Sequence, residues 1–281
     1  MNNQNMSNAP TICELDKVYQ GDCLVWMKQW LGIISPDLII ADPPFNIGYP
    51  YDVYDDNKPD EEYLAWSEQW IKAASDLLKP NGAIWIAIGD EYAAELKWIA
   101  HRKVGLHLRN WVIWYYTFGI HCHRKFSRSH THLLYFTKDP KNFKFRSDAI
   151  RVPSARQTVY KDIRANPVGR VPDNTWILRP QEHLYTIFQP DEDTWYFPRI
   201  AGTFKERVPL IKCQMPEKLL ERIILACTDE GDLVFDPFAG SGSSLVAAKK
   251  LKRKCIGCEL SANYAREANK RIAEIILISD H

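Results

Sequence analysis

The sequence of 281 residues contains no apolar segment long enough to cross a membrane. The longest apolar run, residues 272–278, is interrupted by Glu274, whereas a membrane helix needs roughly 18 to 20 apolar residues. The first ten residues also lack the basic and apolar segments of a secretory signal. We therefore expect residues 1–10 to be a flexible tail, and we expect a cytoplasmic protein without a membrane segment.

The cysteines form neither a disulfide framework nor a metal-binding pattern. Their number is odd, and they are scattered at positions 13, 23, 122, 213, 227, 255 and 258, as is typical of buried thiols. Cys255 and Cys258 lie on an expected buried strand, and no second pair with this spacing accompanies them. The histidines of residues 121–132 fall in a basic stretch, where phosphate contact or solvation explains them. No metal site is expected.

Low-complexity segments, internal repeats and glycine–serine linkers are also missing. The hydrophobic fraction of 46% and the charged fraction of 25% are ordinary for a globular protein. A largely disordered or fibrous chain is therefore excluded, and a packed core is expected.

The net charge of +1 conceals an uneven distribution along the chain. Residues 1–100 carry 6 basic and 16 acidic side chains, residues 101–212 carry 20 and 9, and residues 213–281 carry 10 of each. The middle block also contains seven of the eight histidines and several aromatic residues. This mixture suits phosphates and stacked bases, although a solvated basic face would have the same charge.

Short apolar segments alternate with segments of helical spacing. Four of the apolar segments end in loops rich in Asp, Gly or Pro, which is typical of buried parallel strands whose carboxyl ends carry a site. They are Val18–Gln20, Asp37–Ala41, Ala83–Ile88 and Leu233–Phe235. Apolar residues at helical spacing predict one helix over about 60–78 and a second that includes Leu219 to Ala226, with Pro216 in its first turn. The alternation predicts an α/β protein with a mostly parallel, doubly wound sheet and helices on both faces.

One of these loops has the composition of a nucleotide-binding turn. Asp236-Pro-Phe-Ala-Gly-Ser-Gly follows an expected strand and precedes an expected helix. Gly240 and Gly242 allow close backbone approach, and the helix start offers free N–H groups to an anion. Glu259, at the end of the next strand, can accept hydrogen bonds from a ribose. Leu245 replaces the third glycine of the dinucleotide motif, which argues against a dehydrogenase.

A second loop suits an amino group on a flat ring. Asp42-Pro43-Pro44-Phe45 follows a buried strand, and the two prolines fix the backbone and present their carbonyl oxygens as acceptors. Asp42 adds a carboxylate, and Phe45 adds an aromatic face. Two acceptors and a stacking ring fit the exocyclic amine of a nucleobase. A merely proline-stiffened turn explains neither the acid nor the aromatic residue.

Together, DPPF and DPFAGSGS resemble the motifs of the amino-methyltransferases of DNA. In that family a D/N/S-P-P-Y/F/W motif holds the target amine, and an F-x-G-x-G loop holds S-adenosyl-L-methionine. The order of the motifs is similar to that of the β class, and the ordered matches cover roughly residues 15–139 and 206–275. One position departs from the pattern: Met215 stands where members commonly have a lysine credited with binding the cofactor carboxylate.

The resemblance implies a Rossmann-like methyltransferase fold with permuted motif order and a role for each motif. Asp42, Pro43, Pro44 and Phe45 would be the catalytic amine site. The residues implied in cofactor binding are Asp22 and Cys23 at the adenine end, Glu259 at the ribose, Phe238, Ala239, Gly240, Ser241, Gly242 and Ser243 at the methionine end, and also Asp42 and Asp236.

The implied reaction is methyl transfer to the exocyclic N6 of an adenine flipped out of double-stranded DNA, because the family links Asp at the first motif position with adenine. Cytosine-N4 methylation, methylation of RNA or a protein glutamine, and a catalytically silent nucleic-acid-binding protein stay open as alternatives. Cytosine-C5 methylation is excluded, because it needs a nucleophilic cysteine after a proline and no cysteine here follows one.

The resemblance also implies domains and partners. Residues 11–139 and 206–281 would form the catalytic and cofactor-binding domain. Residues 140–205, rich in proline and without a long amphipathic helix, would be a target-recognition insertion. Double-stranded DNA is the expected substrate. A homodimer and a cognate restriction endonuclease are partners known in the family, and the sequence decides neither.

Overall fold

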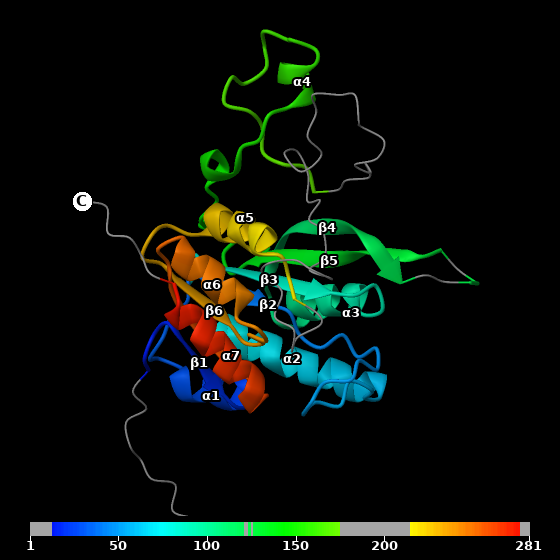
Figure 1. Ribbon diagram of the computed structural model, residues 1–281, viewed down its shortest axis with the longest axis vertical. Helices are drawn as coiled ribbons and strands as arrows, with labels where there is room; N and C mark the ends of the chain where they lie inside the picture. Colours follow the sequence, from blue (N-terminus) through cyan, green and yellow to red (C-terminus); the bar gives the residue numbers. More distant parts are fainter. Residues whose placement is uncertain (1–12, 121–122, 125, 175–213, 276–281) are drawn as a thin grey trace, which may run out of the picture.

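Seven strands form a single sheet in the part of the chain that the computed structural model describes, residues 13–120, 123–124, 126–174 and 214–275 (Figure 1). In chain order they are β1 (Lys17–Gln20), β2 (Leu38–Ala41), β3 (Ala83–Ile88), β4 (His107–Ile120), β5 (Arg128–Thr137), β6 (Leu233–Asp236) and β7 (Lys254–Glu259). Their order across the sheet is β1-β7-β6-β2-β3-β5-β4. The first five strands of this order run parallel, and β5 is antiparallel to both β3 and β4.

The two ends of the chain interleave in this sheet. β6 and β7, from the C-terminal part, lie between β1 and β2, from the N-terminal part. The parallel pairings confirm the predicted α/β sheet. Because β1, β2, β6 and β7 run in the same direction, the loops that follow them emerge at one edge of the sheet. The antiparallel hairpin of β4 and β5 was not predicted. These strands follow one another without an intervening helix, so they depart from the alternation of strands and helices on which the prediction was based.

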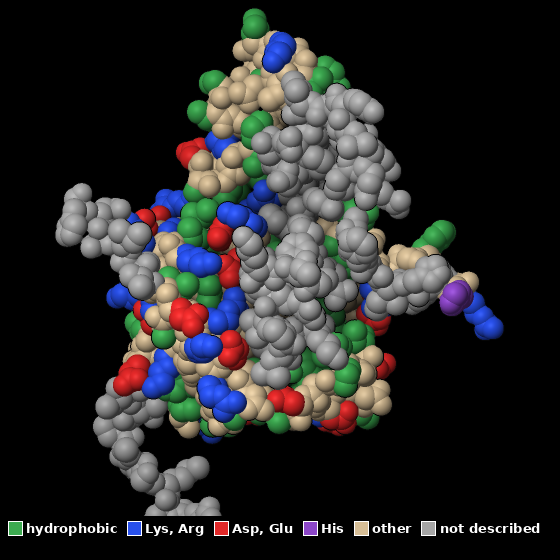
Figure 2. All heavy atoms as spheres, in the orientation of Figure 1, with side chains coloured by type: hydrophobic (Ala, Val, Ile, Leu, Met, Phe, Trp, Pro, Cys, Tyr) green, Lys and Arg blue, Asp and Glu red, His purple; other side chains and the backbone are tan. Residues whose placement is uncertain are grey.

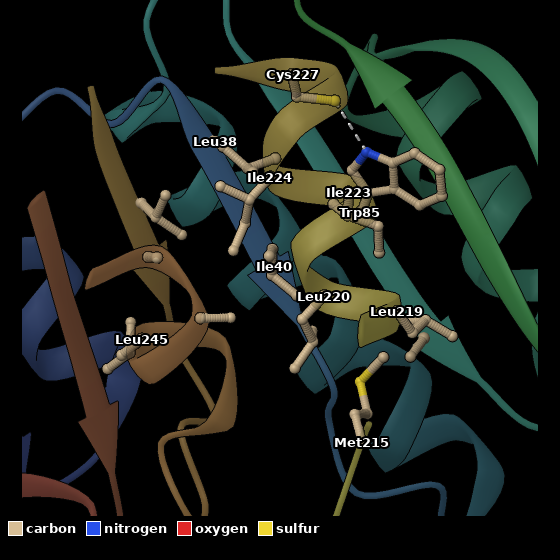
Figure 3. Close-up of a cluster of buried hydrophobic side chains, with 14 of the residues drawn as sticks. Leu38, Ile40, Trp85, Met215, Leu219, Leu220, Ile223, Ile224, Cys227 and Leu245 are labelled. Atoms are coloured by element: carbon tan, nitrogen blue, oxygen red, sulfur yellow. Dashed lines mark hydrogen bonds between the residues drawn. The ribbon is translucent and has the colours of Figure 1, made fainter. Parts of the chain in front are cut away.

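Side chains alternate between two hydrophobic cores, one on each face of the sheet. Leu38 and Ile40 of β2 face the core that includes α5 (Glu217–Cys227), α6 (Ser243–Lys250) and α7 (Ala262–Ala273). Ile39 and Ala41 face the core that includes α1 (Cys23–Trp30), α2 (Asp60–Leu77) and α3 (Ala93–Trp98). Figure 3 shows the first core, where the indole nitrogen of Trp85 donates to the Cys227 sulfur at 3.4 Å. Helices on both faces confirm the expected layers.

The predicted helix boundaries hold to within a residue or two. α2 begins with three acidic residues, which favour the positive end of the helix dipole, and it ends just before Lys79-Pro80. Pro216 lies immediately before α5 and not in its first turn. In the described part of the chain no helix is long and apolar enough to span a membrane.

The first part of the predicted insertion packs on the sheet domain. Ile150, in a 3₁₀ turn (Ser147–Ile150), is buried in the core beside α5, and Arg146 pairs with Asp229. A π-helical turn (Ile99–Lys103) extends α3 on the opposite face. After Ile150 the chain extends away from the sheet with the short α4 (Ala155–Thr158) in Figure 1, and it returns at Asn174, whose carbonyl accepts the Ile113 amide of β4 at 2.9 Å. The remainder of the insertion, from residue 175, lies outside the described residues.

Asp37 connects three strands at the amino-terminal edge of the sheet. It is 3% exposed, and its carboxylate accepts hydrogen bonds from the Lys79 ammonium at 2.7 Å, the Lys144 ammonium at 3.2 Å and the Leu233 amide at 3.1 Å. Burial acts to raise the pKa of Asp37, but the hydrogen bonds from Lys79, Leu233 and Lys144 outweigh it, and the pKa is lowered. The ionised carboxylate therefore stabilises the fold.

We expect Asp37→Ala to lower the free energy of unfolding by about 2 to 4 kcal/mol at pH 7, because it removes the buried partner of two lysines. A carboxyl group whose pKa is lower in the folded than in the unfolded state stabilises the fold at pH values above its unfolded pKa. This stabilisation is lost as the pH falls through the folded pKa. The difference between the two proteins should therefore shrink below about pH 4. Urea unfolding at several pH values measures it. Asp76→Ala, which removes an exposed partner of Lys72 on α2, is the control and should cost less than about 1 kcal/mol.

Candidate active site

The loops at the carboxyl edge of the sheet enclose a cavity of about 310 Å³. They follow β1, β2, β6 and β7, which are neighbours in the sheet, so segments far apart in the sequence meet there. Every predicted site residue except Gly242 lines this cavity. The lining residues among them are Asp22, Cys23, Asp42, Pro43, Pro44, Phe45, Asp236, Phe238, Ala239, Gly240, Ser241, Ser243 and Glu259.

The two glycines of the Asp236 loop have different roles. Gly240 has φ +51°, and a Cβ built there would meet only the Phe238 carbonyl oxygen, at 3.9 Å, so space is open on that side. Gly242 precedes α6 with φ +75°, and a Cβ there would lie 2.9 Å from the Cβ of Ala268 on α7. The second glycine is required by the contact between the loop and α7, a packing role that the motif alone did not distinguish from ligand contact.

The loop that follows β2 is held in place by residues outside the motif. The buried hydroxyl of Tyr63 on α2 donates to the Pro44 carbonyl at 2.8 Å. The buried carboxylate of Asp56 accepts the backbone amides of Asn46, Ile47 and Tyr49 at 2.8 to 3.1 Å. The two proline carbonyls are therefore not equivalent, since that of Pro44 already accepts a hydrogen bond.

The other two acceptors of this loop have no such partner. Neither the Asp42 carboxylate nor the Pro43 carbonyl accepts a hydrogen bond from any residue that the structure describes. Phe45 lies against Gly89 in the loop after β3. A Cβ built on Gly89 would be 3.2 Å from the Phe45 ring. The loop thus offers two acceptors and a supported aromatic ring to the cavity.

Burial changes the acidity of the carboxyl groups around the cavity. Burial, together with the charge of Asp236, raises the pKa of Asp42 to about 7. Burial also raises the pKa of Asp236 to about 7, although the Ser244 hydroxyl and the Phe238 amide donate to its carboxylate. Burial also raises the pKa of Glu259. The backbone amides of Ser261 and Gly240 donate to its carboxylate at 2.8 Å each, which lowers the pKa but does not offset the effect of burial.

The cavity is acidic as a whole, and neighbouring carboxylates add to the effect of burial on these pKa values. Six carboxylates line it: Asp22, Asp42, Asp52, Asp56, Asp236 and Glu259. Arg128 is the one Lys or Arg side chain among the described lining residues, and it pairs with Asp90 and Glu91. The cavity therefore favours a ligand with positive charge and several hydrogen-bond donors.

Aromatic residues that the sequence analysis did not assign to the site also line the cavity. Trp66 is half-buried there, with ring centroids 5.9 Å from Tyr54 and 5.6 Å from Phe238. Trp114 is buried and also lines the cavity, whereas Trp70 is buried and is not among the described lining residues. Tyr63, Trp66 and Trp70 share one face of α2, so helical spacing alone could not show which of them reaches the cavity.

The described residues contain no group of three or more His, Cys, Asp or Glu side chains arranged to hold a metal ion. His121 and Cys122 lie outside the described residues. Cys255 and Cys258 are fully buried on β7, as predicted. Cys23 is buried at the start of α1, where burial raises the pKa of its thiol, so it serves as cavity wall and not as a nucleophile.

Comparison with known proteins identifies the family of this site. A family model described as DNA methylase, of the N6 and N4 methyltransferases, matches residues 36–270. The chain belongs to this family. Membership explains why both motifs line one cavity, and the expected resemblance to the DNA amino-methyltransferases is confirmed.

Several methyltransferases match most of the chain. The type II methyltransferase M.HpaI of Haemophilus parainfluenzae is 37% identical over 238 residues, which cover 85% of this chain and 68% of that protein. M.BglII of Bacillus subtilis is 32% identical over 267 residues, covering 89% and 67%. The DNA adenine methyltransferase YhdJ of Escherichia coli (strain K12) is 30% identical over 262 residues, covering 92% and 83%.

Solved structures share the fold at lower identity. M1.HpyAVI in complex with S-adenosyl-L-methionine has a TM-score of 0.61 and 22% identity, with 91% of this chain and 98% of that chain covered. The cytosine-N4-specific PvuII DNA methyltransferase has a TM-score of 0.62 and 18% identity, covering 93% and 87%. The predicted Rossmann-like methyltransferase fold is thereby confirmed.

As a member of this family, the chain is a methyltransferase that uses S-adenosyl-L-methionine. The cavity fits this cofactor in two respects. The open space beside Gly240 leaves room for a ligand against the loop backbone. The lining carboxylates suit a molecule that carries a sulfonium, an ammonium and a ribose diol.

We expect Asp42→Asn to raise the melting temperature of the ligand-free protein by a few degrees at pH 8. A carboxyl group whose folded pKa is raised binds its proton more tightly in the folded state, so its cost to stability grows as the pH rises from the unfolded value to about 7. The gain should therefore be smaller at pH 5. Scanning calorimetry at both pH values measures it, with the exposed Asp55→Asn as control. A lower melting temperature at pH 8 would contradict the raised pKa.

Proposed function

We propose that the protein methylates the exocyclic N6 of an adenine flipped out of double-stranded DNA, with S-adenosyl-L-methionine as the methyl donor. One observation carries this proposal. The Asp42 carboxylate and the Pro43 carbonyl, without a donor among the described residues, line the same cavity as the loop from Phe238 to Ser243. An amine acceptor and a cofactor loop in one cavity are what methyl transfer requires.

The chemistry of the amine explains the role of the two acceptors. The amine of a nucleobase is a poor nucleophile because its lone pair is delocalised into the ring. Hydrogen bonds to the Asp42 carboxylate and the Pro43 carbonyl would localise that lone pair and stabilise the positive charge that develops on nitrogen. The raised pKa of Asp42 also lets this carboxylate take the proton that the amine gives up.

The cofactor would supply an electrophilic methyl group on its sulfonium, and the chain would orient it. We assign the methionine end to the loop from Phe238 to Ser243 and the start of α6. Glu259 would accept the ribose hydroxyls, since two backbone amides already fix its carboxylate in place. Asp22 and Cys23, at the start of α1, would border the adenine end.

A target base cannot reach this cavity from inside a duplex. Extrusion of the nucleotide costs a few kcal/mol, and stacking on an aromatic ring returns about 1 to 3 kcal/mol. Phe45, supported by the contact at Gly89, would provide that ring. The Phe45 ring thus serves to hold the flipped base while Asp42 and Pro43 hold its amine.

Adenine is favoured over cytosine by the residue at the head of the motif. A carboxylate accepts a hydrogen bond more strongly than the serine hydroxyl that the family links with cytosine. The relative YhdJ is described as a DNA adenine methyltransferase. Cytosine-N4 is the second candidate, since the PvuII enzyme has the same fold and acts on cytosine.

We place DNA recognition in the basic block of residues 101–212, with residues 140–205 as the target-recognition region. In the described part of this region, exposed apolar side chains at Tyr160, Ile163 and Val168 accompany the basic side chains. Several of those basic residues are paired, as Arg156 and Arg164 are with Asp162. We further propose a cognate restriction endonuclease as a partner and a cytoplasmic site of action; two of the relatives are named type II methyltransferases.

We expect Asp42→Ala to lower the methylation rate by about two to four orders of magnitude, because the lost hydrogen bond acts on the reacting amine. DNA affinity should stay near that of the wild type.

For the wild type, kcat/KM should fall about tenfold per pH unit below about pH 7, where Asp42 becomes protonated, and the variant should lack this dependence. Asp55→Ala, exposed in the same loop region, is the control. An Asp42→Ala protein with most of its activity would refute the role of the carboxylate.

The product decides between the two bases. Expression in cells that lack DNA methylation, followed by digestion of their DNA to nucleosides and mass spectrometry, should yield N6-methyladenine as the main modified base. N4-Methylcytosine as the main product would show that the carboxylate does not select adenine. Modified RNA with unmodified DNA would instead favour an RNA substrate. Mapping the modified bases along the genome also gives the recognition sequence.

A further inference from the structure

A buried arginine holds the back of the cofactor loop. Arg271, near the end of α7, has a side chain that is only 13% exposed. One guanidinium nitrogen donates to the Ser241 carbonyl at 2.6 Å and to the Ser243 hydroxyl at 3.2 Å. Arg271 is not among the described residues that line the cavity, whereas Ser241 and Ser243 are. The arginine thus contacts the loop from the side away from the ligand.

The same guanidinium connects the loop to α5. Its other terminal nitrogen pairs with Glu217 at 2.9 Å, and Glu217 also accepts the Lys250 ammonium at 2.5 Å. Glu217 begins α5, two residues after Met215, which lines the cavity. Arg271 therefore links α5, the loop and α7 at one end of the cavity.

The packing of α7 makes this link rigid. Ala268 lies one helical turn before Arg271 and packs against Gly242. A Cβ built on Gly242 would be 2.9 Å from the Cβ of Ala268. Ser241 and Ser243 are 4% and 5% exposed, and their hydroxyls are 3.0 Å apart. A loop packed this tightly can hold its hydroxyl and amide donors in fixed directions.

The charges of this group differ from those of the rest of the cavity. Two cations, Arg271 and Lys250, contact one carboxylate, that of Glu217. Lys250 is 44% exposed and is screened by solvent, whereas Arg271 is not. Basic and acidic side chains are intermixed over the outer face formed by α5, α6 and α7 (Figure 2).

We infer that Arg271 is the positioning residue for the carboxylate of the cofactor's amino-acid end, an inference that rests on the proposed function. It acts through Ser241 and Ser243, whose donors it orients, and through its positive charge behind them. Six carboxylates line the cavity and repel a ligand carboxylate, so the anionic group fits best where a cation lies behind the wall, at Ser241 and Ser243. Met215, which has no charge, cannot provide this interaction.

The test compares ligands that keep or lack the amino-acid end. S-Adenosyl-L-methionine and S-adenosylhomocysteine carry the carboxylate, and 5′-methylthioadenosine does not. Calorimetry should show that Arg271→Met binds the first two about 10- to 100-fold more weakly, because the donors of Ser241 and Ser243 are no longer held in place and the charge behind them is gone. Its affinity for methylthioadenosine should stay within about twofold of the wild type, because that ligand never meets the charge. In turnover, KM for the cofactor should rise while kcat at saturation changes little.

Two matched variants separate the role of Arg271 from general effects of charge. Lys250→Met removes the other cation on Glu217 without touching the loop, and Arg266→Ala removes an arginine of α7 that bonds Asn263. Both should bind all three ligands within about threefold of the wild type. Arg271→Lys keeps the charge but lacks the guanidinium fork, so it should lose about threefold to tenfold for the carboxylate-bearing ligands alone.

The outcomes are distinguishable. Equal loss for all three ligands would mean that Arg271 only maintains the shape of the cavity, and no loss for any would mean that it has no role; either result overturns the inference. If Arg271→Met does not fold, Arg271→Lys decides, and unchanged affinity in that variant overturns the inference as well. A wild-type protein that binds the cofactor but methylates no DNA would refute the proposed function without affecting the assignment of Arg271.

Discussion

The parallel pairing of β2 with β6 is the contact on which the whole site depends. It joins Leu38 to Val234 and Ile39 to Phe235, strands from opposite parts of the chain. Since both strands end at the same edge, Asp42 and Asp236 come close enough for their charges to interact. A slip of one residue in this register would turn Ile39 and Phe235 out of their shared core, so packing on both faces enforces the geometry of the site.

The same edge creates an electrostatic conflict. Carboxylates at the ends of adjacent buried strands repel one another and lose hydration, which is why the pKa values of Asp42 and Asp236 are raised. A fold selected for stability alone would place amides there. The acidic edge suits a cationic cofactor and an amine substrate, and Arg271 adds a charge of the opposite sign behind the cofactor loop.

Much of the architecture was predictable because it is encoded locally. Ala83–Ile88 is a strand with the predicted bounds, since an apolar segment between a Pro-Asn-Gly turn and Gly89-Asp90 has few other conformations in a buried sheet. The DPPF loop and the Asp236 loop were also recognisable, because each concentrates its chemistry in consecutive residues. The β4–β5 hairpin was missed because its antiparallel pairing depends on where β3 leaves a free edge.

Residues that act across elements required the folded structure. Tyr63 holds the loop of Asp42 from α2, and Asp56 holds it from further along the same connection; no local pattern marks either residue. Gly242 looks like a ligand glycine in sequence, yet its neighbour is Ala268 on α7. The sequence by itself determined the two motifs, the parallel strands and the family, because short-range order and residue type suffice for these. Which acceptors stay free, which aromatic rings line the cavity and which cation lies behind the cofactor loop were decided only by tertiary packing, because each depends on side chains that are distant along the chain and adjacent in space.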